Sequence, residues 1–272
     1  MLGWTMTIPI HVKPENAGAV AICESKTSLY QQLYPLASTA YFTATKTYLI
    51  SSFTDIRNMV LKLVGNKIAS CTHRVALVLH EKQVPFEFVN IDFKKGEHKA
   101  PEFLKHQPFG QVPYIDDDGF ILYESRAIAE YIALKYPDQG TKLVPTELKA
   151  LALSKQAASV ELNNFNEYAE KAVAEVVFKR FWGVEPDQTV FEKLISALDK
   201  KLDVYDQILS KQKYLAGDDI TLADLYHLPY GSLLSVAGSD IMERKPHVAR
   251  WFADLSSRPS WQALKDGVVA TA

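Results

Sequence analysis

Two adjacent residues that could carry chemistry, Ser70 and Cys71, lie in the stretch GNKIASCTHRV, directly before an amphipathic helix pattern. A serine hydroxyl can donate a hydrogen bond, and a cysteine becomes a nucleophile when its thiolate is stabilised. A helix N-terminus together with the nearby His73 and Arg74 could provide that stabilisation. The alternative is structural, with Ser70 as a helix cap and Cys71 as a small buried apolar residue.

A proline at the start of a predicted strand indicates a second functional position. In FGQVPYI, Pro113 cannot donate to a strand ladder. If the Val112–Pro113 peptide bond is cis, the backbone N–H and C=O of Val112 turn outward and can pair with an extended ligand as an added strand would. A trans proline at a sheet edge is the alternative.

Charged and polar residues at two other places could bind the ends of such a ligand. In YESRAIAEY, Glu124 and Ser125 lie at a strand-to-helix junction, with Ser125 as the expected N-cap. The free N–H groups of the first helical turn and the Ser125 hydroxyl suit a carboxylate, while Glu124 suits an ammonium group. In GEHK, His98 and Lys99 could pair with a second carboxylate. A solvated surface is the alternative at each place.

The composition excludes several classes of function. Thirty basic and 32 acidic side chains give the 272-residue chain a formal charge of −2, so no overall field favours nucleic acid or an anionic membrane. Two cysteines are too few for a disulfide framework or a structural zinc cluster, which fits a reducing compartment and predicts a cytoplasmic protein. No apolar run reaches the roughly 18 residues of a membrane span.

The hydrophobic pattern predicts two folded domains after an extension. Residues 1–58 lack a clear period and are expected to form a poorly defined N-terminal extension, and the clean pattern from Met59 also fits translation starting there. Residues 59–137 follow the order β-α-β then α-β-β-α, an α/β domain. Residues 138–147 are rich in proline and polar residues and form a linker.

Residues 148–272 are expected to be all-helical, because apolar residues recur at helical spacing almost throughout. Residues 148–183 could hold one long helix or two. Thr221 and Asp224 predict a local N-capping arrangement with a structural role. Several aromatic residues could line a pocket or belong to the core, namely Phe165, Tyr168, Phe178, Phe181, Trp182 and Tyr226.

Four motifs in register, GEHK, PFGQVP, ESRAI and YLAGDDITLADL, resemble the glutathione transferase family, in particular its phi-like class of plants and fungi. The resemblance extends from Val60 to about Leu264. It implies a thioredoxin-like α/β N-terminal domain, an all-α C-terminal domain and usually a homodimer. It also implies glutathione as a co-substrate with no other cofactor and no metal, and a small hydrophobic electrophile bound between the domains.

The resemblance assigns a glutathione-binding role to individual residues. His98 and Lys99 take the glycine carboxylate, Val112 before a cis Pro113 pairs with the cysteinyl unit, and Gln111 lies alongside. Glu124 and Ser125 take the γ-glutamyl end, and Arg126 supports that junction. These roles agree with what the charges could do without the resemblance.

The sequence departs from the family pattern at the catalytic position. Counting back from RVALVL, the usual serine that donates to the glutathione sulfur would stand at position 69, where this chain has Ala69. A thiol of pKa about 8.5 is mostly protonated at neutral pH, and lowering it by two units requires only about 2.7 kcal/mol. One good donor with a helix N-terminus could supply that, but alanine has no donor.

Three hypotheses follow for the catalytic position. Ser70 takes over the role, as the SC run, similar to one in the zeta class, suggests. Alternatively, Cys71 forms a mixed disulfide with glutathione and the protein catalyses thiol transfer or deglutathionylation. In the third, the protein binds glutathione or another ligand without turnover. The favoured prediction is a glutathione transferase that conjugates small hydrophobic electrophiles and serves in detoxification.

Overall fold

A four-stranded mixed sheet forms the centre of the first domain. The computed structural model describes residues 60–271, so the predicted extension over residues 1–58 lies outside the described residues. The strands are β1 (Leu61–Gly65), β2 (Phe86–Asn90), β3 (Tyr114–Asp117) and β4 (Phe120–Tyr123). Their order is β2-β1-β3-β4, with β1 and β2 parallel and β3 antiparallel to both of its neighbours.

Helices α3 (Ser70–Glu81) and α5 (Ser125–Lys135) pack side by side against this sheet. Their apolar stripes supply fully buried core residues such as Leu77, Leu79 and Ile132. Between β2 and β3 lie the short 3-10 turn η1 (Glu97–Lys99) and helix α4 (Pro101–Leu104). The order β-α-β then α-β-β-α confirms the predicted thioredoxin-like domain.

One continuous helical run opens the second domain, which resolves the question of one helix or two. It consists of α6 (Leu148–Val160), the π-helical segment η2 (Glu161–Asn166), α7 (Glu167–Val173), a second π-helical segment η3 (Ala174–Phe178) and α8 (Lys179–Phe181). Gly183, with φ of 71°, follows its end. A π-helical turn adds a residue to the ladder and is frequent at functional sites.

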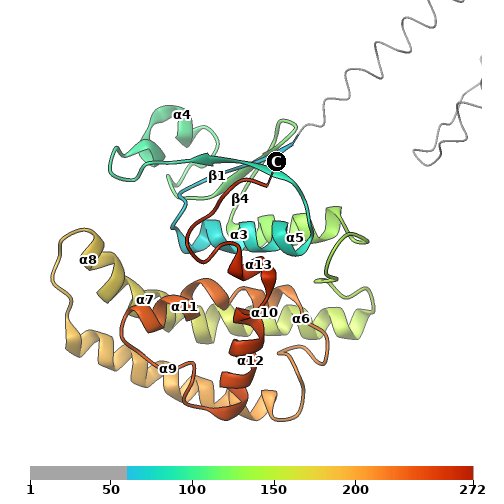
Figure 1. The fold of residues 1–272 in the computed structure, drawn as a ribbon, viewed down its shortest axis with the longest axis vertical. Coiled ribbons are helices and arrows are strands. Elements are labelled where there is room, and N and C mark those ends of the chain that lie inside the picture. The colour runs from blue at the N-terminus through green and yellow to red at the C-terminus, as the bar shows by residue number, and fades with distance from the viewer. Residues whose placement is uncertain (1–59, 272) are drawn as a thin grey trace, which may run out of the picture. The chain divides into compact units, whose positions relative to one another are not determined.

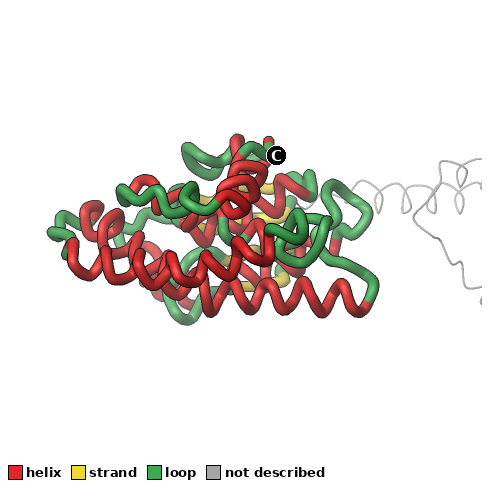
Figure 2. The backbone as a smooth tube through the Cα atoms, turned by 90° about the horizontal axis from the view of Figure 1, so that it is seen from below, coloured by secondary structure: helices red, strands yellow, loops and turns green. Residues whose placement is uncertain are grey.

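The remaining helices complete an all-α domain. They are α9 (Gln188–Leu209), α10 (Leu222–Leu225), α11 (Leu228–Val236), α12 (Pro246–Ser256) and α13 (Pro259–Gln262). Thr221 and Asp224 form the predicted capping box at α10, and buried Asp224 also accepts from Trp251 Nε1 at 3.0 Å, which fits a structural role. Figure 1 shows α3 and α5 between the sheet and this helical layer, and Figure 2 shows the helices in front of the strands when seen from below.

The chain after α13 returns to the first domain. Val268 N donates to Lys67 O at 2.9 Å, close to the loop that precedes α3. Thr271 N donates to Phe86 O at 3.2 Å, and Phe86 N donates to Thr271 Oγ1 at 3.3 Å. This tail therefore pairs with β2, a strand at the edge of the sheet.

Candidate active site

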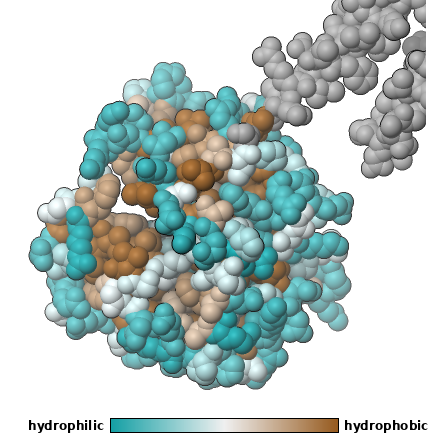
Figure 3. Space-filling model, viewed as in Figure 1, coloured by the Kyte–Doolittle hydropathy of each residue, from teal (hydrophilic) through white to brown (hydrophobic). Residues whose placement is uncertain are grey.

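A cavity of about 750 Å³ lies between the two domains. The first domain contributes Ile68, Ala69, Ser70, Cys71, Phe93, His98, Lys99, Gly110, Gln111 and Val112. The helical domain contributes Glu170, Val177, Phe178, Phe181, Trp182, Tyr230 and Leu233. Figure 3 shows apolar side chains gathered around a hollow on the viewed face. One wall thus offers polar and backbone groups and the opposite wall is mainly aromatic.

The N-terminus of α3 opens into this cavity. Ala69 is the N-cap residue, with φ of −73° and ψ of 129°, and no side chain caps the helix. Ser70 is the first helical residue and only 5% exposed, and its Oγ has no hydrogen-bond partner among the described residues. Buried hydroxyls are nearly always paired, so an unpaired one on a cavity wall is a group that a ligand could satisfy.

Arg74 lies behind this helix terminus, fully enclosed. Its Nη1 donates to Cys71 Sγ at 3.4 Å and to Ser125 Oγ at 2.8 Å. Burial alone would lower the pKa of Arg74, but its interactions with Cys71 and Glu161 outweigh burial, so the pKa is raised. A permanent positive charge therefore lies under the sulfur of Cys71, where it would stabilise a thiolate.

His98 and Lys99 reach the cavity from η1. The Lys99 ammonium donates to Phe109 O at 3.2 Å. Burial, and then the charge of Lys99, lowers the pKa of His98, so its imidazole is neutral near pH 7. Only Lys99 thus offers a full positive charge to a carboxylate here, and His98 offers a neutral hydrogen bond.

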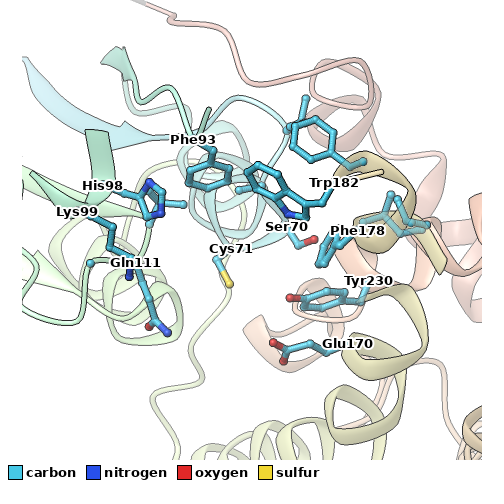
Figure 4. A pocket seen from close by; sticks show the side chains of 17 residues that line it. Ser70, Cys71, Phe93, His98, Lys99, Gln111, Glu170, Phe178, Trp182 and Tyr230 are labelled. Carbon is cyan, nitrogen blue, oxygen red and sulfur yellow. The ribbon is translucent and has the colours of Figure 1, made fainter. Parts of the chain in front are cut away.

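The Val112–Pro113 bond is cis, as the resemblance implied. Val112 lies just before β3, and neither its N–H nor its C=O has a hydrogen-bond partner within residues 60–271. Figure 4 shows Gln111 beside Lys99 on the same side of the cavity. The backbone of Val112 is therefore free to pair with an extended ligand between the loop at η1 and the start of α3.

The junction at Glu124 differs from its predicted geometry in one respect. Ser125 is the first residue of α5 and not its N-cap, because Glu124 takes that position with φ of 72°. The Ser125 hydroxyl instead accepts from Arg74, a residue 51 positions earlier. Glu124 is exposed, and none of the residues 124–126 lines the cavity.

Arg126 joins this junction to the helical domain. Its Nε and Nη2 donate to the two carboxylate oxygens of Glu161 at 2.9 and 2.8 Å. The Glu161 side chain is fully buried, so this is a bidentate ion pair with one partner removed from solvent. Arg126 thereby fixes the start of α5 against η2 and does not face the cavity.

The aromatic residues singled out from the sequence divide into two groups. Phe178, Phe181 and Trp182 line the cavity, whereas Phe165 and Tyr226 are buried in the core and Tyr168 packs against it, partly buried. The sequence alone could not separate the two groups, because the division depends on where each residue lies relative to the first domain. Tyr230 lines the cavity and was missed, because its place among the apolar residues of α11 is typical of a core residue.

Residues 60–271 contain no cluster of three or more histidine, cysteine, aspartate or glutamate side chains arranged to hold a metal ion. None of the helices described is both long enough and apolar enough to cross a membrane.

Comparison with known proteins decides the family. The family model for the glutathione S-transferase N-terminal domain matches residues 59–134, and the model for the C-terminal domain matches residues 146–259. The chain belongs to the glutathione S-transferase family.

Individual relatives of this glutathione transferase agree with the assignment. Glutathione S-transferase hmp2 of Hypomyces subiculosus is 45% identical over 75% of this chain and 96% of its own length. Glutathione S-transferase F6 of Arabidopsis thaliana is 41% identical over 75% of this chain and 98% of its own length. The crystal structure of glutathione transferase F7 from Populus trichocarpa superposes with a TM-score of 0.74, at 42% identity, over 76% of this chain and 98% of its own. The F-class plant relatives support the phi-like class.

Proposed function

We propose that this transferase joins the sulfur of reduced glutathione to small hydrophobic electrophiles. The observation that carries the proposal is the division of the cavity, with His98, Lys99, Gln111 and Val112 on one wall and aromatic side chains on the other. The N-terminus of α3 lies where the walls meet. A peptide thiol held along the first wall would present its sulfur to an apolar molecule held by the second.

The chemistry of this step is a displacement or addition at carbon. The thiol of glutathione loses its proton to solvent, the thiolate forms a C–S bond with the electrophile, and a leaving group such as halide departs with its bonding electrons. The protein contributes by lowering the thiol pKa and by holding the two reactants together. The N–H groups of the first turn of α3 and the Ser70 hydroxyl are the proposed donors, in line with the similarity of the SC run to one in the zeta class.

The binding roles proposed for the glutathione molecule follow the resemblance. Lys99, with neutral His98, takes the glycine carboxylate, and Val112 pairs with the cysteinyl backbone beside Gln111 and the cis Pro113. Glu124 takes the γ-glutamyl ammonium group and Ser125, held by Arg74, offers its helix terminus to the carboxylate. Arg126 acts indirectly, through its ion pair with Glu161.

A second function rests on Cys71, which lines the cavity half-buried and accepts from Arg74. Its thiolate would attack the glutathione sulfur of a mixed disulfide and release the other thiol. A second glutathione thiolate would then attack the Cys71 mixed disulfide, giving oxidised glutathione and regenerating Cys71. A protein that retains glutathione without either activity is the remaining alternative.

A paired assay separates these functions. Purified wild-type protein, Ser70→Ala and Cys71→Ser are compared for conjugation of glutathione to an aromatic halide and for reduction of a glutathione mixed disulfide. Conjugation by the wild type that survives in Cys71→Ser supports the first function. Full conjugation by Ser70→Ala would remove Ser70 from its role, and loss of reduction alone in Cys71→Ser would favour thiol transfer. Retention of glutathione without either reaction would indicate a binding protein.

Wider properties belong to the same proposal. We expect a cytoplasmic homodimer that serves in detoxification, organised as residues 59–137 for glutathione, a linker over 138–147 and residues 148–272 for the electrophile. The scarcity of cysteine and the near-neutral charge support this location and predict no membrane or nucleic-acid partner. Sedimentation of the purified protein would test the oligomeric state.

A further inference from the structure

Position 69, where the family resemblance implies a serine donor, is an alanine in this chain. Ala69 occupies the N-cap of α3, and Ser70 begins the helix with its hydroxyl buried on the cavity wall. Figure 4 shows the Ser70 oxygen on the side of Phe178 and Tyr230, and not on the side of His98 and Gln111. A glutathione sulfur held near this helix terminus would therefore contact the side chains of the helical domain that face Ser70.

The helical domain presents a tyrosine hydroxyl there. Tyr230 lies in the first half of α11, and its side chain is only 5% exposed. Its ring lies 6.0 Å from the Arg74 guanidinium carbon, so the two side chains are neighbours at the cavity wall. The Tyr230 hydroxyl lies close to the hydroxyl of Ser70, and Figure 4 shows it directed toward the space beside Cys71.

The charges around Tyr230 keep its hydroxyl protonated. Burial raises the pKa of Tyr230, the neighbouring Cys71 and Glu170 raise it further, and Arg74 and the nearby Ser70 hydroxyl act in the opposite direction. Glu170 lies beside Tyr230 in the same view and accepts from Asn166 Nδ2 at 2.7 Å. A tyrosine that stays protonated is an O–H donor and not a base, so it suits a position next to a forming thiolate.

We propose that the Tyr230 hydroxyl, supplied by the helical domain, donates a hydrogen bond to the sulfur of bound glutathione and so replaces the donor that Ala69 cannot provide. The inference rests on the proposed function, because it requires glutathione to lie with its sulfur at the N-terminus of α3. It makes Tyr230 a catalytic residue beside Ser70. A hydrogen bond to an ionised acceptor is about twice as strong as one between neutral groups, so the bond favours the thiolate over the thiol.

The test is a titration of the bound thiol. Glutathione is bound to saturation by wild type, Tyr230→Phe and Tyr214→Phe, and thiolate formation is followed by ultraviolet absorbance against pH. Tyr214→Phe is the matched control, because it removes a buried tyrosine hydroxyl that donates to Asp254 at 2.8 Å outside the cavity. Circular dichroism checks that each variant is folded, and Tyr230→Phe keeps the ring that packs against Arg74.

The expected result is an upward shift of the apparent thiol pKa by about one unit in Tyr230→Phe only, which is about tenfold less thiolate on the acidic side of the titration. Conjugation should fall about tenfold there and recover at high pH. An unchanged thiol pKa in Tyr230→Phe overturns the proposal. If the KM for the electrophile rises while the thiol pKa stays unchanged, Tyr230 only lines the electrophile pocket, and the proposal is likewise overturned.

The same experiment separates this inference from the proposed function. A wild-type protein that forms the thiolate but yields no conjugate contradicts the proposed function, while the shift in Tyr230→Phe still supports the tyrosine donor. A wild-type protein that binds no glutathione overturns both. Ser70→Ala is titrated in the same way, and a shift there with none in Tyr230→Phe would assign the donor to Ser70 alone and overturn the inference.

Discussion

Two serines begin neighbouring helices of the first domain, and they differ in what their hydroxyls contact. Ser70 begins α3 and Ser125 begins α5, and they are 5% and 6% exposed. Ser125 accepts from Arg74 at 2.8 Å, whereas Ser70 has no partner among the described residues. Ser70 lines the cavity and Ser125 does not.

The difference separates a fixed group from an available one. The environment of Ser125 is set by two arginines, since Arg74 donates to it and Arg126 next to it pairs with buried Glu161. No arginine donates to Ser70, and its Oγ is unpaired among the described residues, so its hydroxyl can reorient toward a ligand. Identical residues at identical helix positions thus support different roles.

The largest expected effect comes from removing the ion pair between Arg126, the residue after Ser125, and Glu161 of the helical domain. Arg126→Leu leaves the Glu161 carboxylate buried without its partner, and we expect the free energy of unfolding to fall by about 3 kcal/mol. Urea denaturation measures it. Lys155→Met is the control, because its pair with Glu130 is exposed and should contribute under about 0.5 kcal/mol. Equal losses of unfolding free energy in Arg126→Leu and Lys155→Met would contradict the conclusion that the ion pair of Arg126 with buried Glu161 fixes the start of α5.

The two serines can be compared directly by removing each hydroxyl. Ser125→Ala should cost about 1.5 kcal/mol of stability, because Arg74 Nη1 loses a buried acceptor. Ser70→Ala should cost less than about 0.5 kcal/mol, since its hydroxyl makes no bond in the free protein. Thermal unfolding in the absence of glutathione measures both variants. A stability loss in Ser70→Ala equal to that in Ser125→Ala would contradict the conclusion that only the Ser125 hydroxyl is hydrogen-bonded in the free protein.

The smallest expected effect concerns His73, which lies in the first turn of α3, three residues after Ser70. Its Nε2 lies 3.0 Å from Leu264 O, and burial lowers its pKa from 6.5 despite the carbonyl groups of Ala69 and Leu264. A lowered pKa means that protonation favours the unfolded chain, so this contribution is present above about pH 6.5 and is lost as the pH falls below it.

A non-titrating variant isolates that contribution. His73→Phe should cost about 1 kcal/mol at pH 7.5 through the lost bond to Leu264. The gap between wild type and His73→Phe should then narrow as the pH falls below 6.5. Urea denaturation at several pH values measures the gap, and buried His227, whose pKa burial lowers to about 4, contributes to both proteins and cancels. A stability difference that widens as the pH falls would contradict a lowered pKa for His73.

The elements of the fold followed from local pattern. The apolar runs at β1 and β2, the acidic turn between β3 and β4, and the helical spacing after residue 148 all lie where the sequence predicts them. The capping box of Thr221 and Asp224 is a contact over three residues, and it is present. Local contacts of this kind depend on spacing that the sequence states directly.

The contacts that shape the site join residues far apart in the chain. Ser125 was expected as an N-cap, but its hydroxyl is taken by Arg74, which α3 brings across from the neighbouring helix. The apolar residues around Tyr230 in α11 predict a core residue. Its place on the cavity wall becomes visible only when the two domains are packed together. Neither contact has a sequence period, so only the packed structure reveals them.

The tail that pairs with Phe86 has a consequence for how copies of this protein meet. Strand β2 is at the edge of the sheet, and unpaired edge groups are a template for pairing with another chain. Thr271 takes up both the N–H and the C=O of Phe86. The last residues described therefore occupy the part of this edge at Phe86, where another chain could otherwise pair, and Val268 ties the same segment to the loop that leads into α3.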